Sequence, residues 1–392
     1  MSIGAKRVEN VQLSQIRAVM DKARSLMAQG KSVINLGIGE PDFPSPLHVN
    51  EAAKKALDDQ ETHYAPNRGL LSLREALAKK LAVDNGITVD PEKEIIITVG
   101  AAEALFIAMV GLLNPGDEVI IIEPAFPSYV NICRLVGAVP VPVAAREENG
   151  WVPDPEDIEK AITPRSKMII INSPNNPSGS VYPKEVLMSV AKICEKHNIF
   201  VVCDEIYEKI IYPGNTHFSI ASMPGMDELT ITINGYSKAY AMTGWRLAYV
   251  VAKPELILPM LKVHQYATTC VATFAQIGAI AATTGPQDCV VEMRNEFQRR
   301  RDLVAKGLND IEGISCFTPQ GAFYAFPNIK AFGLSSAEFC DFLLEKAGVA
   351  VVPGTTFMSE DGYIRLSYAT SYEVLADALQ RMKDALRGKY CS

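Results

Sequence analysis

The most constraining feature of this sequence is a series of short, mainly apolar runs that alternate with longer segments of helical periodicity. The runs lie at residues 94–99, 118–122, 168–171, 199–203, 230–233 and 246–251. Strands that are apolar on both faces are typical of a parallel sheet covered by helices on each side. The sequence therefore predicts an α/β fold with a mostly parallel sheet, within a large domain that spans residues 45–285.

The pattern changes after Gly285 and Pro286. A charged helical segment at 292–309 leads into four strand-like stretches, which read ISCFTP, AFYAFPNI, VAVVPG and YIRLSYAT. Strands and helices in this order predict a smaller α+β domain. The first 44 residues hold a helical stretch and then a short strand that breaks into Gly and Pro, and by pattern alone they could pack on either domain.

Composition excludes several classes of function. The 392 residues carry a net charge of −7, so we expect neither a nucleic-acid partner nor an anionic membrane surface. A charge at residue 6 with no apolar run behind it argues against a secretory signal, which predicts a cytoplasmic protein. The longest charge-free stretch, 265–287, is rich in Thr, Gln and Gly and predicts a packed helix rather than a membrane span.

Cysteine and histidine spacing gives no sign of a metal. The eight cysteines contain no C-x-x-C pair, and the five histidines show no ligand spacing. We expect reduced thiols and no metal site.

Chemistry-bearing residues follow four of the apolar runs. Ligands of open α/β sheets lie beyond the carboxyl ends of the strands, so these residues should meet. They are a helix start of small residues, an amide, an acid with a tyrosine, and a lysine with an arginine: 100–103, Asn176, Asp204 with Tyr207, and Lys238 with Arg246.

Each of these groups has an ordinary explanation, as a tight helix start, a turn, a cap or a solvated charge. Together they match the needs of pyridoxal 5'-phosphate: a lysine for its aldehyde, an acid for its ring nitrogen, donors for its phenolic oxygen and a phosphate cup. A lysine desolvated among small and aromatic residues, as at Lys238, has a lowered pKa and is a nucleophile for a carbonyl.

Eight motifs in order along the chain resemble those of one enzyme family: 35–43 (NLGIGEPDF), 63–77 (HYAPNRGLLSLREAL), 100–105 (GAAEAL), 123–129 (EPAFPSY), 173–179 (SPNNPSG), 204–207 (DEIY), 237–246 (SKAYAMTGWR) and 363–368 (YIRLSY). They resemble the fold-type I, pyridoxal phosphate-dependent aminotransferases of class I and II, which include aspartate, aromatic and kynurenine aminotransferases. The resemblance covers nearly the whole chain. It implies a seven-stranded sheet and a small domain built from residues 1–44 and 286–392.

The resemblance also implies roles for individual residues around the cofactor. Lys238 would hold the cofactor covalently and act as general base, and Asp204 would bind its pyridinium N–H. The remaining cofactor contacts would be Tyr207 and Asn176 on the phenolic oxygen, Phe126 stacked on the ring, and the backbone of Ala101 and Ala102 with Ser237 and Arg246 on the phosphate. Tyr64 would reach the same phosphate from the partner subunit of a homodimer.

For the substrate, the resemblance implies that Arg365 grips the α-carboxylate, helped by Asn176 and the backbone near Gly39. The implied reaction moves an amino group from an L-amino acid to a 2-oxo acid, with 2-oxoglutarate as the expected acceptor and ping-pong kinetics. The small domain would move inward on binding and exclude water.

The sequence departs from the family pattern in two ways, and the second leaves the donor open among aspartate, alanine and aromatic amino acids. Gly235 replaces a serine that contacts the phosphate in many relatives, a loss of about 1 kcal/mol. Ala102 stands where some aspartate enzymes have a lysine, and residues 265–276 contain no basic residue. Arg17 and Arg68 are the remaining candidates for a distal carboxylate, and Phe126, Tyr129, Phe323 and Tyr324 could form an aromatic pocket.

Two other functions fit the same motifs. A carbon–sulfur β-lyase would use the same lysine and cofactor to eliminate a β-substituent. A non-catalytic regulatory module could bind the cofactor alone, although no basic DNA-binding segment precedes residue 35.

Overall fold

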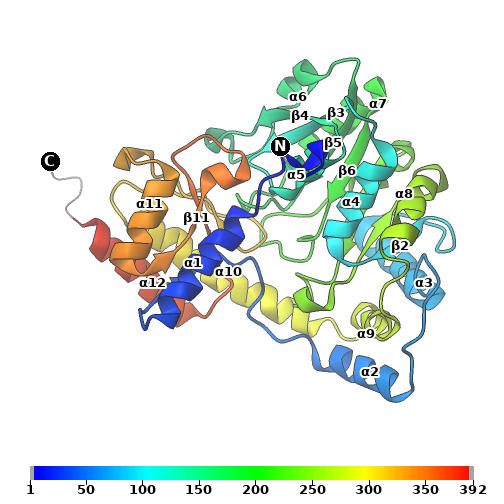
Figure 1. The fold of residues 1–392 in the computed structure, drawn as a ribbon, viewed down its shortest axis with the longest axis horizontal. Coiled ribbons are helices and arrows are strands. Elements are labelled where there is room, and N and C mark those ends of the chain that lie inside the picture. The colour runs from blue at the N-terminus through cyan, green and yellow to red at the C-terminus, as the bar shows by residue number, and fades with distance from the viewer. Residues whose placement is uncertain (1–3, 388–392) are drawn as a thin grey trace.

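The computed structural model describes residues 4–387 and has a seven-stranded sheet at the centre of its larger half (Figure 1). In chain order the strands are β2 (Ile95–Thr98), β3 (Glu118–Glu123), β4 (Val139–Ala144), β5 (Ser166–Asn172), β6 (Phe200–Asp204), β7 (Thr230–Gly235) and β8 (Ala248–Val251). Their order across the sheet is β2-β8-β7-β6-β5-β3-β4, and all pairs are parallel except those of β8. The predicted α/β fold is confirmed.

Alternate residues of these strands enter different cores. On β3, Val119 and Ile121 pack with α4 (Gly100–Leu112), α5 (Ser128–Leu135) and α8 (Pro254–Ala267), whereas Ile120 and Ile122 pack on the opposite face. That opposite face is covered by α6 (Pro155–Ala161) and α7 (Lys184–His197), with α2 (Leu47–Asp58), α3 (Leu71–Lys80) and α9 (Thr273–Thr284) nearer β2. Burial on both faces explains why apolar residues follow one another in most of these runs without alternating with polar ones.

Strand β4 was not predicted, because its sequence VPVPVA contains Pro140 and Pro142. It lies at the edge of the sheet and pairs only with β3. Proline has no N–H to donate, so an edge is the position in a sheet where it is tolerated.

Two small sheets lie in the other half of the molecule. The parallel pair of β1 (Ile34–Asn35) and β10 (Val349–Ala350) joins the N-terminal part of the chain to the C-terminal part. The second sheet is antiparallel, in the order β11 (Val352–Pro353), β12 (Ile364–Ser367) and β9 (Tyr324–Ala325). The helices here are α1 (Gln15–Ala28), α10 (Asp288–Asn309), α11 (Ser336–Phe342) and α12 (Tyr372–Leu386).

The structure corrects two details of the sequence interpretation in this half. The stretch ISCFTP forms no named strand and contributes a single bridge, between Ser315 and Asn328. The charged helix begins at Asp288, four residues before the predicted start. The domain boundaries at residues 45 and 285 stay a prediction, although every strand of the large sheet lies between residues 95 and 251.

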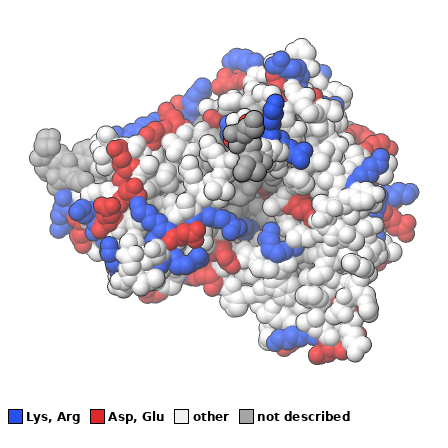
Figure 2. Space-filling view, viewed as in Figure 1, with Lys and Arg blue, Asp and Glu red and all other residues white. Residues whose placement is uncertain are grey.

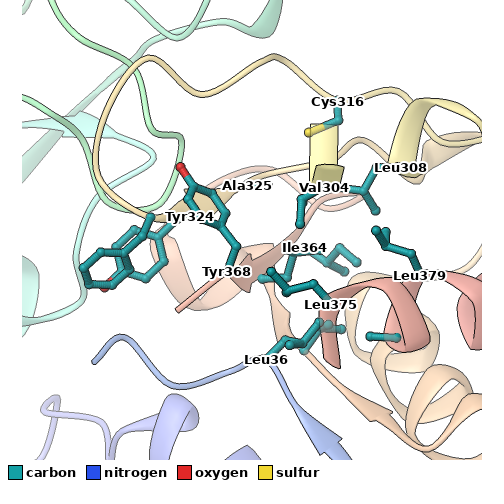
Figure 3. Packing of buried hydrophobic residues seen from close by; sticks show 14 of the residues in the cluster. Leu36, Val304, Leu308, Cys316, Tyr324, Ala325, Ile364, Tyr368, Leu375 and Leu379 are labelled. Carbon is teal, nitrogen blue, oxygen red and sulfur yellow. The ribbon is translucent and has the colours of Figure 1, made fainter. Parts of the chain in front are cut away.

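One apolar core fills the second half and includes residues that follow β6, among them Tyr207 (Figure 3 shows part of this core). Phe297 of α10 is fully buried, and its ring centroid lies 5.4 Å from that of Phe43 and 5.1 Å from that of Phe323. The same cluster includes Tyr207 and Tyr324, so the packing of this half also fixes side chains at the end of β6.

The predicted packing of 265–287 agrees with the position of α9 against α2 and α3. Within residues 4–387, no helix has the length and hydropathy needed to cross a membrane. The described cysteines are all free thiols, and Cys391 lies outside the described residues.

Candidate active site

A cavity of about 500 Å³ opens where the carboxyl ends of β5, β6 and β7 meet the start of α4. Figure 2 shows a hollow in the middle of this face, with lysine and arginine side chains on its rim, and α1 crosses the face beside it (Figure 1). The predicted site residues that line the cavity are Gly39, Ala101, Ala102, Phe126, Asn176, Asp204, Tyr207, Ser237, Lys238, Arg246 and Arg365. Tyr64 does not line it and is 89% exposed on this chain.

The start of α4 forms a cup for an anion. The first N–H groups of a helix have no partner within the helix, and Val99 at the N-cap supplies no side-chain acceptor for them. Gly100 has a positive φ of 75°, and a Cβ at this position would collide with the guanidinium of Arg246. The arginine thus packs directly on the helix start, where helix dipole and guanidinium both attract negative charge.

Lys238 follows β7 and points into the cavity. Its Nζ donates a hydrogen bond of 2.6 Å to the carbonyl of Gly39, and it lies 5.7 Å from the ring centroid of Phe323. Burial lowers the pKa of Lys238 to about 8, with Arg365 and Arg246 acting in the same direction. About a tenth of its amine is therefore neutral and nucleophilic at pH 7, far more than for an ordinary lysine.

Asp204 ends β6 and is buried. Its carboxylate accepts a 2.8 Å hydrogen bond from the Tyr129 hydroxyl and a longer one from the N–H of Ile206. Burial raises the pKa of Asp204, and these hydrogen bonds oppose that change. No ion pair of Asp204 is formed within residues 4–387, so its charge is available to a cationic ring nitrogen at the cavity.

Arg365 is the most unusual group in the cavity, because it is only 1% exposed yet has no carboxylate within ion-pair distance in the described chain. One Nη donates to Asn176 Oδ1 at 3.2 Å and the other to the Gly37 carbonyl at 2.7 Å. Its Nε has no partner among residues 4–387. Burial of an unpaired charge costs free energy, so an anion in the cavity would stabilise this guanidinium.

Several residues of the site were not assigned from the sequence. The Tyr129 hydroxyl donates a hydrogen bond to Asp204, and the Tyr324 hydroxyl lies 2.8 Å from that of Tyr207. From the sequence, Tyr129 and Tyr324 are expected only as aromatic residues near a pocket. The motif EPAFPSY contains Tyr129 and could have identified it. Of the two candidate distal arginines, Arg17 lines the cavity, whereas Arg68 donates to the Lys93 carbonyl and lies outside the lining.

Glu205, Glu208 and His217 form a cluster behind Asp204, with ligand-type atoms within 4.8 Å of one another. His217 Nε2 lies 2.9 Å from the Glu205 carboxylate, and Lys80 forms an ion pair with Glu208. Burial opposes protonation of His217, but the neighbouring Glu205 carboxylate raises its pKa overall. The two carboxylates are therefore partnered by cationic groups of the chain itself, and we assign no metal here.

Comparison with known proteins identifies the family. The family model described as aminotransferase class I and II matches residues 31–382. The chain belongs to the class I and II aminotransferases. This aminotransferase is 47% identical to an aspartate aminotransferase of Pyrococcus abyssi over 98% of both chains, and 44% identical to aromatic-amino-acid aminotransferase 2 of Thermococcus litoralis, with the same coverage.

A solved structure agrees with these relatives. The aspartate aminotransferase from Thermus thermophilus with maleate matches this aminotransferase with a TM-score of 0.94 and 44% identity, over 98% of this chain and 100% of that one. The predicted family, fold and reaction type are confirmed.

The structure explains one of the two departures from the family pattern. Gly235 on β7 pairs with Ala248 on β8, and a Cβ at Gly235 would lie 2.6 Å from the Ala248 Cβ. A serine in this position needs β8 to move. The absence of a side chain at Gly235 therefore allows β7 and β8 to pack closely at this pair.

We expect Gly235→Ser to lower the free energy of unfolding by about 1–3 kcal/mol, because it overpacks a buried strand pair. Chemical unfolding of the single and double variants measures the effect. In Gly235→Ser/Ala248→Gly, part of the loss should be recovered beyond the sum of the single changes. Purely additive losses would show that the two positions do not collide.

Proposed function

We propose that this chain is a pyridoxal phosphate-dependent aminotransferase that uses aspartate as donor and 2-oxoglutarate as acceptor. The observation that carries the proposal is the pairing of Lys238, with its pKa of about 8, and the unpartnered Arg365 in one cavity. The first is suited to bond an aldehyde and the second to bind a carboxylate.

The residues of the cavity fit the cofactor group by group. Ala101, Ala102, Ser237 and Arg246 would hold the phosphate, and Asp204 would hold the ring nitrogen in its protonated form. The Tyr207 hydroxyl and Asn176 would donate to the phenolic oxygen, with Phe126 against the ring. When bound, pyridoxal phosphate supplies an electron sink for charge that develops at the substrate α-carbon.

The chain's own residues would then orient the substrate and move its proton. Arg365 binds the α-carboxylate through two N–H groups, which fixes the α-carbon within reach of the amine. Lys238 would supply the amine that bonds the cofactor aldehyde, and its Nζ would take the proton from the substrate α-carbon and later give it up. Its lowered pKa suits both steps, because it must accept a proton and give it up.

The pKa of Lys238 predicts how the apoenzyme takes up its cofactor. Only the neutral amine attacks an aldehyde, and lowering the pKa from 10.5 to about 8 makes it neutral at lower pH. The rate of covalent uptake of pyridoxal phosphate should therefore rise with pH and level off above pH 8. Stopped-flow absorbance measures this rate. A rate still rising tenfold per pH unit beyond pH 9.5 would contradict the prediction, and Lys238→Ala should form no bond.

Aspartate is favoured as donor by the names of the relatives and by Arg17. The cations that line the cavity are Arg17, Arg24, Lys238, Arg246 and Arg365. Three of these have roles above, and Arg24 forms an ion pair with Asp21 at 3.2 Å. Arg17 has no acidic partner within 4.0 Å in residues 4–387, and it shares the cavity-facing side of α1 with Met20 and Arg24. It is free for a second carboxylate.

Arg17→Gln should lower kcat/KM for aspartate about 10-fold, in line with loss of a hydrogen bond between charged groups. The value for phenylalanine should stay within twofold, because that donor has no second carboxylate. Arg24→Gln is the matched control, since Arg24 faces the same cavity but is paired. Equal losses for both donors would rule out a distal-carboxylate role for Arg17.

The same donor panel separates transamination from β-elimination. Glutamate formed from 2-oxoglutarate supports the aminotransferase, whereas pyruvate and ammonia released without glutamate would support a carbon–sulfur β-lyase. A wild-type chain that binds the cofactor and turns over no donor would support the non-catalytic module.

A homodimer with shared sites is part of the proposal. Tyr64 is 89% exposed on this chain, as is Tyr266 in the last turn of α8, and such large exposed aromatics fit a protein interface. In a symmetric pair, each Tyr64 would reach the partner's phosphate cup.

Hybrid dimers test this arrangement. Lys238→Ala and Tyr64→Ala chains with different tags, co-expressed and purified for both tags, should recover about half of the wild-type activity, because one of the two sites is then intact. The two parent homodimers are the controls. Activity no higher than the mean of the parents would place Tyr64 outside the partner's site.

A further inference from the structure

Tyr324 contacts two other residues that line the cavity, Tyr207 and Arg365. It lies on β9, is 1% exposed and lines the cavity wall. In Figure 3 it lies at the end of the apolar cluster farthest from Leu308 and Leu379. Its hydroxyl oxygen is 2.8 Å from that of Tyr207, a hydrogen-bond distance.

The ring of Tyr324 contacts the carboxylate-binding group at the same time. The guanidinium carbon of Arg365 lies 4.6 Å from the Tyr324 ring centroid and 4.7 Å from that of Phe357. Two aromatic rings thus hold the buried guanidinium, and both cation–π contacts occur away from bulk water, where they are strongest.

The position of the Tyr324 hydroxyl is tightly confined. A Cβ on Gly39 would collide with this hydroxyl, so the backbone of Gly39 passes directly against it. The carbonyl of the same glycine accepts the hydrogen bond from Lys238 Nζ. The hydroxyl therefore has little freedom to turn away from Tyr207.

The direction of the Tyr207–Tyr324 hydrogen bond follows from proton counting. Each phenol carries one proton, and the proposed function has Tyr207 donate its proton to the phenolic oxygen of the cofactor. The Tyr207 oxygen must then accept from Tyr324. Burial raises the pKa of both tyrosines, so both keep their protons at working pH.

We propose that Tyr324 is a positioning residue that polarises Tyr207 through its hydroxyl and holds Arg365 through its ring. A hydroxyl that accepts one hydrogen bond donates a stronger one, by roughly 10–30% in chains of such bonds. Tyr324 thereby strengthens the bond from Tyr207 to the phenolic oxygen. This inference rests on the proposed function, because it needs the cofactor beside Tyr207.

Tyr324→Phe tests the hydroxyl and keeps the ring. Without the Tyr324 hydroxyl, Tyr207 is a weaker hydrogen-bond donor, and the phenolic oxygen of the cofactor becomes more basic. The Lys238 nitrogen bonded to the cofactor lies next to this oxygen and should therefore keep its proton to a higher pH. The pH midpoint of the visible absorbance of the holoenzyme should therefore rise by about half a pH unit, in keeping with a modest cooperative effect. KM for the donor should change less than twofold, because the ring still holds Arg365.

A matched control exists in the same core. Tyr368 is fully buried, and its hydroxyl lies 3.0 Å from that of Tyr212, but neither lines the cavity. Tyr368→Phe removes an equivalent buried hydroxyl and should leave the absorbance midpoint unchanged. Equal shifts in the Tyr324 and Tyr368 variants, or no shift in Tyr324→Phe, would overturn the proposal.

Three further variants separate the two contacts. If the hydroxyl acts through Tyr207, then Tyr207→Phe and Tyr207→Phe/Tyr324→Phe should share one midpoint. Tyr324→Leu removes the ring and should raise the Kd for succinate, measured by its effect on the absorbance, at least fivefold. Different midpoints in the Tyr207 background would contradict the relay. A wild-type holoenzyme with no visible band would instead refute the proposed function.

Discussion

Arg365 is buried without a carboxylate to neutralise it, and several groups around the cavity stabilise its charged guanidinium. An unpaired charge in a protein interior costs several kcal/mol after relaxation. Here the guanidinium is held by the Asn176 amide, the Gly37 carbonyl and the rings of Tyr324 and Phe357. None of these removes the positive charge. The positive charge of Arg365 therefore favours binding of an anion, and a substrate carboxylate is such an anion.

That requirement links the two halves of the molecule. Arg365 lies on β12, whereas Asn176 follows β5 of the large sheet and Gly37 follows β1. One side chain therefore holds three parts of the chain that are far apart in sequence. The core around Phe297 reaches Tyr207 and Tyr324, so the packing that fixes the smaller half also positions the aromatic side chains beside the cavity. Stability and ligand recognition share the same contacts in this region.

Sequence patterns predicted the parts of this structure that depend on local signals. The apolar runs predicted the strands of the large sheet apart from β4, and the residues after the runs predicted Asp204, Tyr207 and Lys238 as neighbours, because strand ends in a parallel sheet share one edge. No strand was assigned to the sequence of β4, whose two prolines are unusual in a strand except at the edge of a sheet. The Tyr207–Tyr324 bond joins residues 117 positions apart, and no local pattern encodes such a contact. Arg17 and Arg68 were equivalent in the sequence, and only the fold shows that Arg17 faces the cavity.

The two departures from the family pattern can each be related to another residue of the structure. Gly235 cannot carry a side chain unless β8 moves, because Ala248 lies opposite, so the glycine at this position suits the packing of the two strands. Ala102 leaves the start of α4 without a cation of its own for a second carboxylate, whereas α1 brings Arg17 to the same cavity from another part of the chain. Recognition of a dicarboxylate requires a positive charge at a suitable distance from Arg365, and it does not require that charge to come from one particular element. Under the proposed function, α1 would therefore supply the positive charge for a second carboxylate through Arg17, while Arg365 would bind the α-carboxylate.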